Sequence, residues 1–434
     1  MSFDQFHFNP QIRAGISALG FTTPTPIQQQ AIPKVMEGRD VLGLAQTGTG
    51  KTAAFVLPIL QRLSTGPRGR VRALIIAPTR ELAEQISVAI ANMGRQTGLH
   101  GMTVYGGVSQ HHQVLGLKKA DIVVACPGRL LDLMQQRHAD LSQLEMLVLD
   151  EADQMFDMGF LPSIRRIIKL IPQKRQTLLF SATMPDDIRH LAHECLKDPV
   201  TVSVNHESAL TSVAHALYPV KEHRKTAMLL ELLKPTAMET VLVFTRTKHR
   251  AKKLDKVLTN AGFSAASLQG NLSQNKRKAA LDGFRSGKFN ILVATDIAAR
   301  GIDVSQISHV INFDIPDTPE AYTHRIGRTG RAAKTGDAFT LITGEDEGMV
   351  RTIERKLGKT IERRKLEGFD YDKGPEQQHH QGQHKGHQNA QRHQQQHGGR
   401  PQHQGGGQQH GGGHGQHHGG GHGRNRHGGH RRRR

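Results

Sequence analysis

Short runs of Val, Ile and Leu recur along the chain, and segments with a helical spacing of apolar residues separate them. Runs of this kind are typical of strands that are buried on both faces of a sheet. The segments between them, such as 81–93 and 250–261, carry the apolar spacing of helices. The alternation predicts an α/β fold in which a parallel sheet with its helices is built twice. The runs occupy residues 41–44, 72–77, 121–125, 145–150, 176–180, 240–244, 290–294 and 308–313.

The end of the chain differs sharply in composition from the rest. Residues 374–434 contain 18 Gly, 14 Gln, 14 His and nine Lys or Arg, but a single acid and a single aliphatic side chain. Such a segment buries too little apolar surface to offset the entropy lost on ordering, so we expect it to be disordered. We predict an N-terminal domain at 1–205, a linker at 206–218, a second domain at 219–368 and a disordered Gly/Gln/His/Arg-rich basic tail at 369–434.

Composition excludes several classes of protein. No run approaches 18 apolar residues, and the first ten residues lack a basic segment followed by an apolar one, so we expect neither a membrane helix nor a secretory signal. The two cysteines, Cys126 and Cys195, make no disulfide framework and favour a cytoplasmic location. A net charge of +20, of which +8 lies in 374–434, favours a nucleic-acid partner.

A phosphate-binding loop is predicted at residues 45–52, which read AQTGTGKT and follow the run at 41–44. Glycines let successive N–H groups turn toward an anion, a lysine reaches the β- and γ-phosphates, and a hydroxyl serves Mg²⁺. Gly48, Gly50, Lys51 and Thr52 supply these groups at the start of a helical segment, where the dipole favours phosphate. Ala45 stands where the strict pattern has glycine.

Asp150 ends the run at 145–150, and a second acid, Glu151, follows it directly. Ligands of parallel α/β sheets bind at the carboxyl ends of the strands. One carboxylate at such an end can serve Mg²⁺ while the other orients a water molecule. Acids after a strand are otherwise commonly helix caps, and the phosphate loop favours the catalytic interpretation.

Residues 150–153 spell D-E-A-D, and the chain resembles the DEAD-box ATP-dependent RNA helicases from Phe3 to about Glu367. The motif details look most like the bacterial RhlE subgroup, on the strings PTPIQQQAIP, FTRTKH and ATDIAARGID, the short N-terminal lead and the basic tail. The resemblance implies two tandem RecA-like domains that bind ATP and Mg²⁺ and act on RNA.

The resemblance also implies roles in the nucleotide site. Phe21 would stack on adenine, and Gln28 would bond its edge, which favours ATP over GTP. Thr52 and Asp150 would hold Mg²⁺ largely through water, and Glu151 would position or deprotonate the attacking water. The remaining nucleotide contacts would come from Gly48, Thr49, Gly50, Lys51 and, at the ribose or the finger arginines, Asp303.

A basic string in the second half, HRIGRTGR at 324–331, supplies the positive charge that phosphoryl transfer needs. By resemblance, Arg328 and Arg331 would be the finger arginines. Because they lie in a different half from the phosphate loop, the complete site would require domain closure linked to ATP binding. The residues that would couple hydrolysis to strand separation are Asp153, Ser181, Thr183 and His324.

Candidate RNA contacts come from loops rich in glycines, hydroxyls and arginines that match motifs of the family. Aromatic residues make up 4% of the chain and Trp is absent, so no row of stacking rings is visible. We therefore expect a grip on the backbone with little sequence preference and discrimination of RNA by its 2′-hydroxyl. Cys126 departs from the family, which usually has Thr there. The candidates are Pro78, Thr79, Arg80, Gly106, Gly107, Gly128, Arg129, Thr245, Arg246, Gln274, Arg277 and Thr295.

The leading hypothesis is an ATP-dependent RNA helicase that unwinds short duplexes and remodels RNA or RNA–protein complexes. Ribosomal precursor particles and RNA-decay machinery are partners expected at the level of the family, and no membrane is expected. The alternatives are an ATP-gated RNA clamp with little unwinding and a DNA helicase or translocase. The tail is interpreted as a non-specific RNA tether, with a solubilising role as the alternative.

Overall fold

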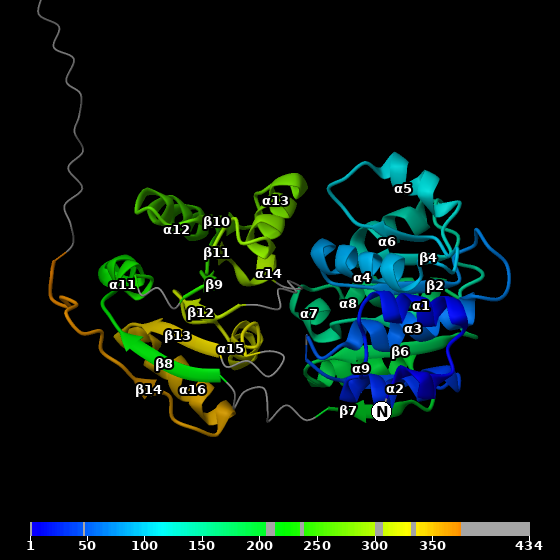
Figure 1. Cartoon of the computed structure of the whole chain (residues 1–434), viewed down its shortest axis with the longest axis horizontal. Coiled ribbons are helices and arrows are strands. Elements are labelled where there is room, and N and C mark those ends of the chain that lie inside the picture. The colour runs from blue at the N-terminus through cyan, green and yellow to red at the C-terminus, as the bar shows by residue number, and fades with distance from the viewer. Residues whose placement is uncertain are drawn as a thin grey trace, which may run out of the picture. The chain divides into compact units, whose positions relative to one another are not determined.

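The computed structural model describes residues 2–46, 48–204, 213–234, 238–299, 307–330 and 336–374. Its described residues contain two seven-stranded parallel sheets, each with its own helices (Figure 1). Strand order in the first is β3-β4-β2-β5-β6-β1-β7, and in the second it is β10-β11-β9-β12-β13-β8-β14. The predicted fold class is confirmed: an α/β architecture with two tandem parallel sheets.

The first lobe consists of the first sheet and the helices η1 to α9 that pack on its two faces. Its strands are β1 (Val41–Leu44), β2 (Ala73–Ile76), β3 (Gly101–Val104), β4 (Ile122–Ala125), β5 (Met146–Leu149), β6 (Gln176–Ser181) and β7 (Val200–Ser203). Its helices are η1 (Phe3–Phe6), α1 (Pro10–Ala18), α2 (Pro26–Met36), α3 (Lys51–Leu63), α4 (Arg80–Met93), α5 (Gln110–Leu117), α6 (Pro127–Gln135), α7 (Ala152–Asp157), α8 (Leu161–Leu170) and α9 (Asp186–Cys195).

The second lobe repeats this plan. Its strands are β8 (Val213–Pro219), β9 (Val241–Phe244), β10 (Ala265–Leu268), β11 (Ile291–Ala294), β12 (His309–Asn312), β13 (Gly336–Ile342) and β14 (Glu362–Arg363). Its helices are η2 (Glu222–Arg224), α11 (Lys225–Leu232), α12 (Lys248–Asn260), α13 (Gln274–Arg285), α14 (Asp296–Ala299), α15 (Pro319–Ile326), η3 (Gly344–Asp346) and α16 (Glu347–Leu357).

Alternate residues of the central strands feed separate cores on the two faces of each sheet. In β2, Ile75 belongs to the core under α2, α3 and α4, whereas Leu74 and Ile76 belong to the core under α6, α8 and α9. In β9, Val243 and Leu242 divide in the same way between two cores of the second lobe. Burial on both faces explains why these strands are continuous apolar runs rather than alternating ones.

The structure extends the second lobe beyond both of its expected bounds. Residues 213–218, which the sequence analysis places in a linker, belong to β8. Residues 369–374, which it places in the tail, are described, and Phe369 and Tyr371 pack against the second-lobe core. The guanidinium of Arg224 lies 4.9 Å from the Phe369 ring centroid and donates to the Asp370 carbonyl at 2.7 Å. The expected disorder of 375–434 lies outside the described residues.

None of the helices in the described part of the chain has the length and apolar character needed to cross a membrane.

Candidate nucleotide and RNA site

The predicted phosphate loop lies between the end of β1 and the start of α3. Gly48 and Gly50 have φ values of 87° and 94°, a left-handed conformation that glycine adopts without steric penalty. A Cβ at Gly50 would lie 2.6 Å from Nε2 of Gln28, so the loop has no room for a side chain there. Lys51 is the first residue of α3, which places the loop at a helix N-terminus.

The segment predicted to bind adenine is tied to the phosphate loop. The Gln28 side chain is buried, donates from Nε2 to the Gly50 carbonyl at 3.0 Å and accepts from the Thr25 N–H at 2.9 Å. The Phe21 ring is 38% exposed and stacks on Phe3 with ring centroids 6.1 Å apart. Gln28 is therefore fixed by the loop, and Phe21 keeps one part of its ring accessible.

The lysine and the two acids converge in a buried setting. Nζ of Lys51 is 3.9 Å from Oδ1 of Asp150 and donates no hydrogen bond to any residue that the structure describes. Burial raises the pKa of Asp150 to about 6, while the charge of Lys51 opposes that rise and Glu151 adds to it. Glu151 follows with φ 55° and ψ 53°, an uncommon conformation for a residue other than glycine.

This arrangement fits a phosphate group and its magnesium ion. A buried ammonium that donates no hydrogen bond to a described residue is suited to a phosphate oxygen. The Thr52 hydroxyl and the Asp150 carboxylate are hard oxygen donors of the type Mg²⁺ prefers. No cluster of three or more His, Cys, Asp or Glu ligands occurs among the described residues. Mg²⁺ commonly binds through one or two carboxylates, water and substrate phosphates rather than in such a cluster.

Three of the four predicted coupling residues form one hydrogen-bond network, and the fourth, His324, lies beside it. Oδ2 of Asp153 accepts from the backbone N–H of Thr183 at 2.9 Å and from its hydroxyl at 3.0 Å. The Ser181 hydroxyl accepts from the Asp153 N–H at 3.2 Å and donates to the Thr183 carbonyl at 2.7 Å. Nε2 of His324 lies 3.7 Å from Oδ2 of Asp153, and burial lowers the pKa of His324. The structure therefore brings these four residues together.

The arginines of 324–331 occupy different environments. Arg325 is buried and makes two hydrogen bonds of 2.6 Å to Asp296, so its charge is used inside the second lobe. Arg328 is also buried and, together with His324, lines a cavity of about 540 Å³. Arg331 and Asp303, two further predicted site residues, lie outside the described residues.

Most of the predicted RNA contacts in the first half line one cavity. The cavity has a volume of about 370 Å³. The predicted residues of the first half in its wall are Pro78, Thr79, Arg80, Gly106, Gly128 and Arg129, and Arg277 of the second half joins them. Gly107 lies next to it: a Cβ at this position would be 2.4 Å from Nη1 of Arg80. Glycine thus allows the Arg80 guanidinium to pack on the backbone.

The second-half candidates divide between exposed and buried positions. Arg246 and Thr295 line the 540 Å³ cavity. Thr245 is fully buried, and its hydroxyl donates to the Thr247 carbonyl at 3.3 Å. Arg277 is buried and pairs with Glu81 at 2.7 Å, and Gln274 donates to the same carboxylate at 3.5 Å. The partners found here for Arg277 and Gln274 are thus protein groups.

Sequence reasoning missed the carboxylates that hold these arginines. Glu81, Asp296 and Asp314 each accept hydrogen bonds from an arginine of a predicted motif. Asp314 directly follows the apolar run at 308–313, as Asp150 ends the run at 145–150. The same signal was therefore present in the sequence.

A phosphate loop, a pair of acids at a strand end and a parallel sheet define an α/β nucleotide-binding protein. The DEAD/DEAH box helicase family model matches residues 25–191, and the helicase conserved C-terminal domain matches residues 224–333. The chain is 44% identical over 360 residues to the ATP-dependent RNA helicase CshA of Listeria monocytogenes, covering 82% of this chain and 69% of the relative. It is 42% identical over 357 residues to CshA of Bacillus subtilis, covering 82% and 72%.

Solved structures give the same result. The structure of S. cerevisiae Dbp5 bound to RNA and ADP BeF3 matches with a TM-score of 0.77 and 30% identity, over 84% of this chain and 95% of that one. DEAD-box helicase Mss116 bound to ssRNA and UDP-BeF matches with a TM-score of 0.78 and 27% identity, over 85% and 80%. The chain belongs to the family of DEAD-box ATP-dependent RNA helicases.

The expected subgroup is not supported. The two relatives above, and a third from Geobacillus kaustophilus that is 43% identical over 356 residues, all carry the name CshA rather than RhlE. The strings that suggested RhlE lie almost entirely within the segments that the two family models match, and a low-complexity tail is a compositional feature.

Proposed function

We propose that this chain is an ATP-dependent RNA helicase that locally unwinds short RNA duplexes and remodels RNA or RNA–protein complexes. The observation that carries the proposal is the buried Lys51 ammonium beside Asp150 and Glu151, at a glycine loop on a helix N-terminus. Membership of the DEAD-box family and the likeness to structures bound to RNA and nucleotide analogues support RNA as the polymer.

In this proposal the first lobe binds ATP and prepares the attacking water. Phe21 stacks on the adenine and Gln28 bonds its edge, while Gly48, Thr49, Gly50 and Lys51 hold the phosphates. Glu151 orients the water and accepts its proton. Thr52 and Asp150 hold Mg²⁺ largely through water, and this ion supplies charge neutralisation at the phosphates when bound.

The second lobe supplies positive charge to the transition state. Arg328 and Arg331 are the proposed fingers, and Asp303 contacts the ribose or these arginines. These residues lie on a different lobe from the phosphate loop, so the site is complete only when the lobes close. ATP binds the closed arrangement more tightly than the open one, and this difference in affinity sets how strongly ATP favours closure. The hydrogen-bond network of Asp153, Ser181 and Thr183, with His324 beside it, couples hydrolysis to the RNA-binding loops.

RNA is held through its backbone by the predicted loops of both lobes. The arginines that contact it are Arg80, Arg129 and Arg246, whereas Arg277 is paired with Glu81. Phosphate contacts position the strand without reading sequence, and contacts to 2′-hydroxyls distinguish RNA from DNA. We place the protein in the cytoplasm, with ribosomal precursor particles or RNA-decay machinery as candidate partners.

The deciding experiment is ATP hydrolysis measured with RNA, with DNA of the same sequence and with neither, alongside unwinding of a short RNA duplex. We expect RNA alone to stimulate hydrolysis and ATP to drive strand separation. Lys51→Ala should abolish both activities, whereas Lys169→Ala, at an exposed position on α8, should leave both unchanged.

The other outcomes identify the rival functions. Equal stimulation by DNA would support a DNA translocase. RNA-stimulated hydrolysis and ATP-dependent RNA retention without strand separation would support an RNA clamp.

A further inference from the structure

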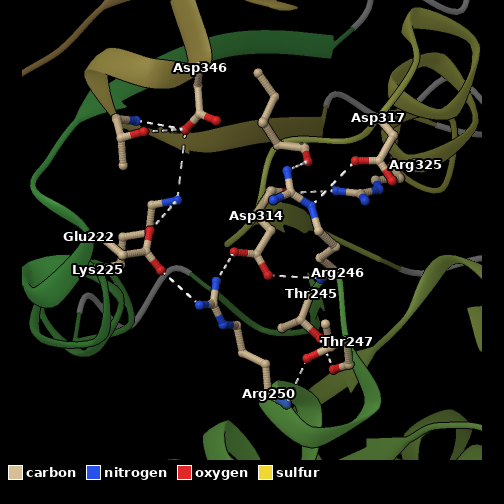
Figure 2. Close-up of polar contacts among 12 residues, drawn as sticks. Glu222, Lys225, Thr245, Arg246, Thr247, Arg250, Asp314, Asp317, Arg325 and Asp346 are labelled. Atoms are coloured by element: carbon tan, nitrogen blue, oxygen red, sulfur yellow. Dashed lines mark hydrogen bonds and ion pairs between the residues drawn. The ribbon is translucent and has the colours of Figure 1, made fainter.

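Asp314 is a buried acid of the second lobe that contacts three arginine residues (Figure 2). It lies two residues after the end of β12 and is 2% exposed. Oδ2 accepts from the backbone N–H of Arg246 at 2.8 Å, and Oδ1 accepts from the guanidinium of Arg250. The Asp314 carbonyl accepts from Nη1 of Arg325 at 2.7 Å.

The contact with Arg246 fixes the loop between β9 and α12. β9 and β12 are neighbours in the sheet, so the residues that follow them meet at the same edge. Asp314 holds the backbone of Arg246, while the Arg246 side chain reaches an exposed partner, with Nε 3.3 Å from Asp317. The carboxylate therefore sets the path of the main chain, and the arginine side chain remains at the surface.

The contact with Arg325 fixes α15. The Arg325 guanidinium also donates to Asn312 at 3.1 Å, and its carbon lies 5.0 Å from the Phe244 ring centroid. Arg328 lies two residues past the end of α15, and its backbone N–H donates to the Arg325 carbonyl at 3.1 Å. Asp314 thus touches the loop that carries Arg246 through its carboxylate and the helix that precedes Arg328 through its backbone carbonyl.

Arg250 neutralises the Asp314 carboxylate from the outer side. Its Nη2 also lies 2.8 Å from Glu222 (Figure 2). Its guanidinium carbon is 5.7 Å from the Phe313 ring centroid. A buried carboxylate that lost this partner would be strongly destabilising, because its charge would remain uncompensated.

We propose that Asp314 is a positioning residue that holds the RNA loop at 245–247 and the arginine-bearing helix α15 in one fixed relation. The inference rests on the proposed function. It makes Asp314 a determinant of RNA affinity and of RNA-stimulated turnover, although it touches neither RNA nor ATP.

Asp314→Asn tests the proposal against Asp317→Asn as its matched control. The asparagine keeps an oxygen for Arg246 but removes the charge that holds Arg250. Removing an acid beside an RNA site should by itself strengthen RNA binding, because fewer negative charges repel the phosphates. Asp317 is exposed and pairs with the side chain of Arg246, so its variant removes the same charge near the RNA site without altering the buried contacts of Asp314.

We expect the two variants to differ in their effect on RNA affinity. Binding of fluorescein-labelled oligo(U), followed by anisotropy below the melting temperature of each variant, should weaken about tenfold in Asp314→Asn. It should be unchanged or tighter in Asp317→Asn. The half-saturating RNA concentration for ATP hydrolysis should rise with the dissociation constant, while the half-saturating ATP concentration changes less than twofold.

An unchanged or tighter RNA dissociation constant in Asp314→Asn overturns the proposal, as does equal weakening in Asp317→Asn. If the unsubstituted chain binds RNA without RNA-stimulated hydrolysis, the proposed helicase function fails, and the binding comparison still decides this inference. Amide hydrogen exchange of the unsubstituted chain is the second measurement. Oligo(U) should protect the amides of residues 245–247 together with those of residues 314 and 315. Protection of 245–247 alone overturns the proposal even if Asp314→Asn does not fold.

Discussion

Glu151 illustrates how a single backbone conformation shapes the site. Its left-handed φ and ψ place it between the end of β5 and the first residue of α7. For a residue other than glycine this conformation costs on the order of 1 kcal/mol and persists only where the surroundings enforce it. Such residues are concentrated at functional sites, which agrees with the role in water activation proposed for Glu151.

Glu151→Gln should separate binding from hydrolysis. The amide preserves the size of the side chain but cannot accept a proton, so turnover should fall by about 10²-fold or more. Binding of a fluorescent ATP analogue and of RNA should change little, because Lys51 and the loop glycines remain. Asp132→Asn, at an exposed position on α6, is the control and should retain full turnover. Brisk hydrolysis by Glu151→Gln would contradict the role of the carboxylate.

At the same scale, the sequence predicted residues that are contiguous and missed residues that meet only through the fold. The phosphate loop occupies eight consecutive positions, so its chemistry can be identified without a structure. Asp314 and Arg246 are 68 residues apart and meet because β9 and β12 are neighbours in the sheet. The strand order that joins them is not encoded by any local pattern.

At the scale of whole elements, the sequence predicted most of the central strands of the sheets and missed the edge strands. All eight predicted runs coincide with strands, and all of these strands lie inside the sheets. Four of the six strands that were not predicted are β3, β7, β10 and β14, which are the outermost strands of the two sheets. An edge strand has a neighbour on one side only and is less buried, so it lacks the continuous apolar run that marks a central strand. The other two are β8 and β13, whose sequences include polar residues.

Packing between helices gives a prediction at the element scale. A Cβ at Gly15 of α1 would lie 2.1 Å from the carbonyl oxygen of Met93, the last residue of α4. Alanine favours a helix over glycine by about 1 kcal/mol, but a backbone clash of this kind typically costs about 1–3 kcal/mol. We therefore expect Gly15→Ala to lower the melting temperature. Ser17→Ala, at an exposed position of the same helix, should leave it unchanged or raise it slightly.

The stability of the whole molecule should depend on pH through histidines that folding keeps neutral. Burial lowers the pKa of His309 in β12, with Asp337 opposing the shift. Below the unfolded pKa of about 6.5, the unfolded chain binds protons that the folded chain does not, so stability falls as pH falls from about 7 toward the folded pKa. Urea unfolding at pH 7.5 and 5.5 should show this loss, and His309→Gln should reduce it. An equal loss in His309→Gln would exclude His309 as a source.

Charge distribution gives the prediction that concerns the entire chain. Residues 374–434 carry +8 of the net charge of +20. The described residues just before them are anchored to η2, since the Lys373 carbonyl lies 3.2 Å from Nε2 of His223. Deleting 375–434 therefore removes the basic segment while retaining this anchor. If the segment contacts RNA phosphates, the truncated protein should bind RNA more weakly.

The salt dependence of binding separates this role from a solubilising one. Each neutralised phosphate of a single strand contributes about 0.7 to the slope of log affinity against log salt concentration, so eight net charges set an upper limit of about 5–6 for the lost slope. We expect the truncated protein to show a slope smaller by at least about 1. Replacing the tail with a scrambled sequence of the same composition should restore the slope, because a tether acts through charge and reach rather than order. Replacing the Lys and Arg residues of the tail with Gln should not restore the slope. An equal slope in the full-length and truncated proteins would show that the tail does not contribute to RNA binding.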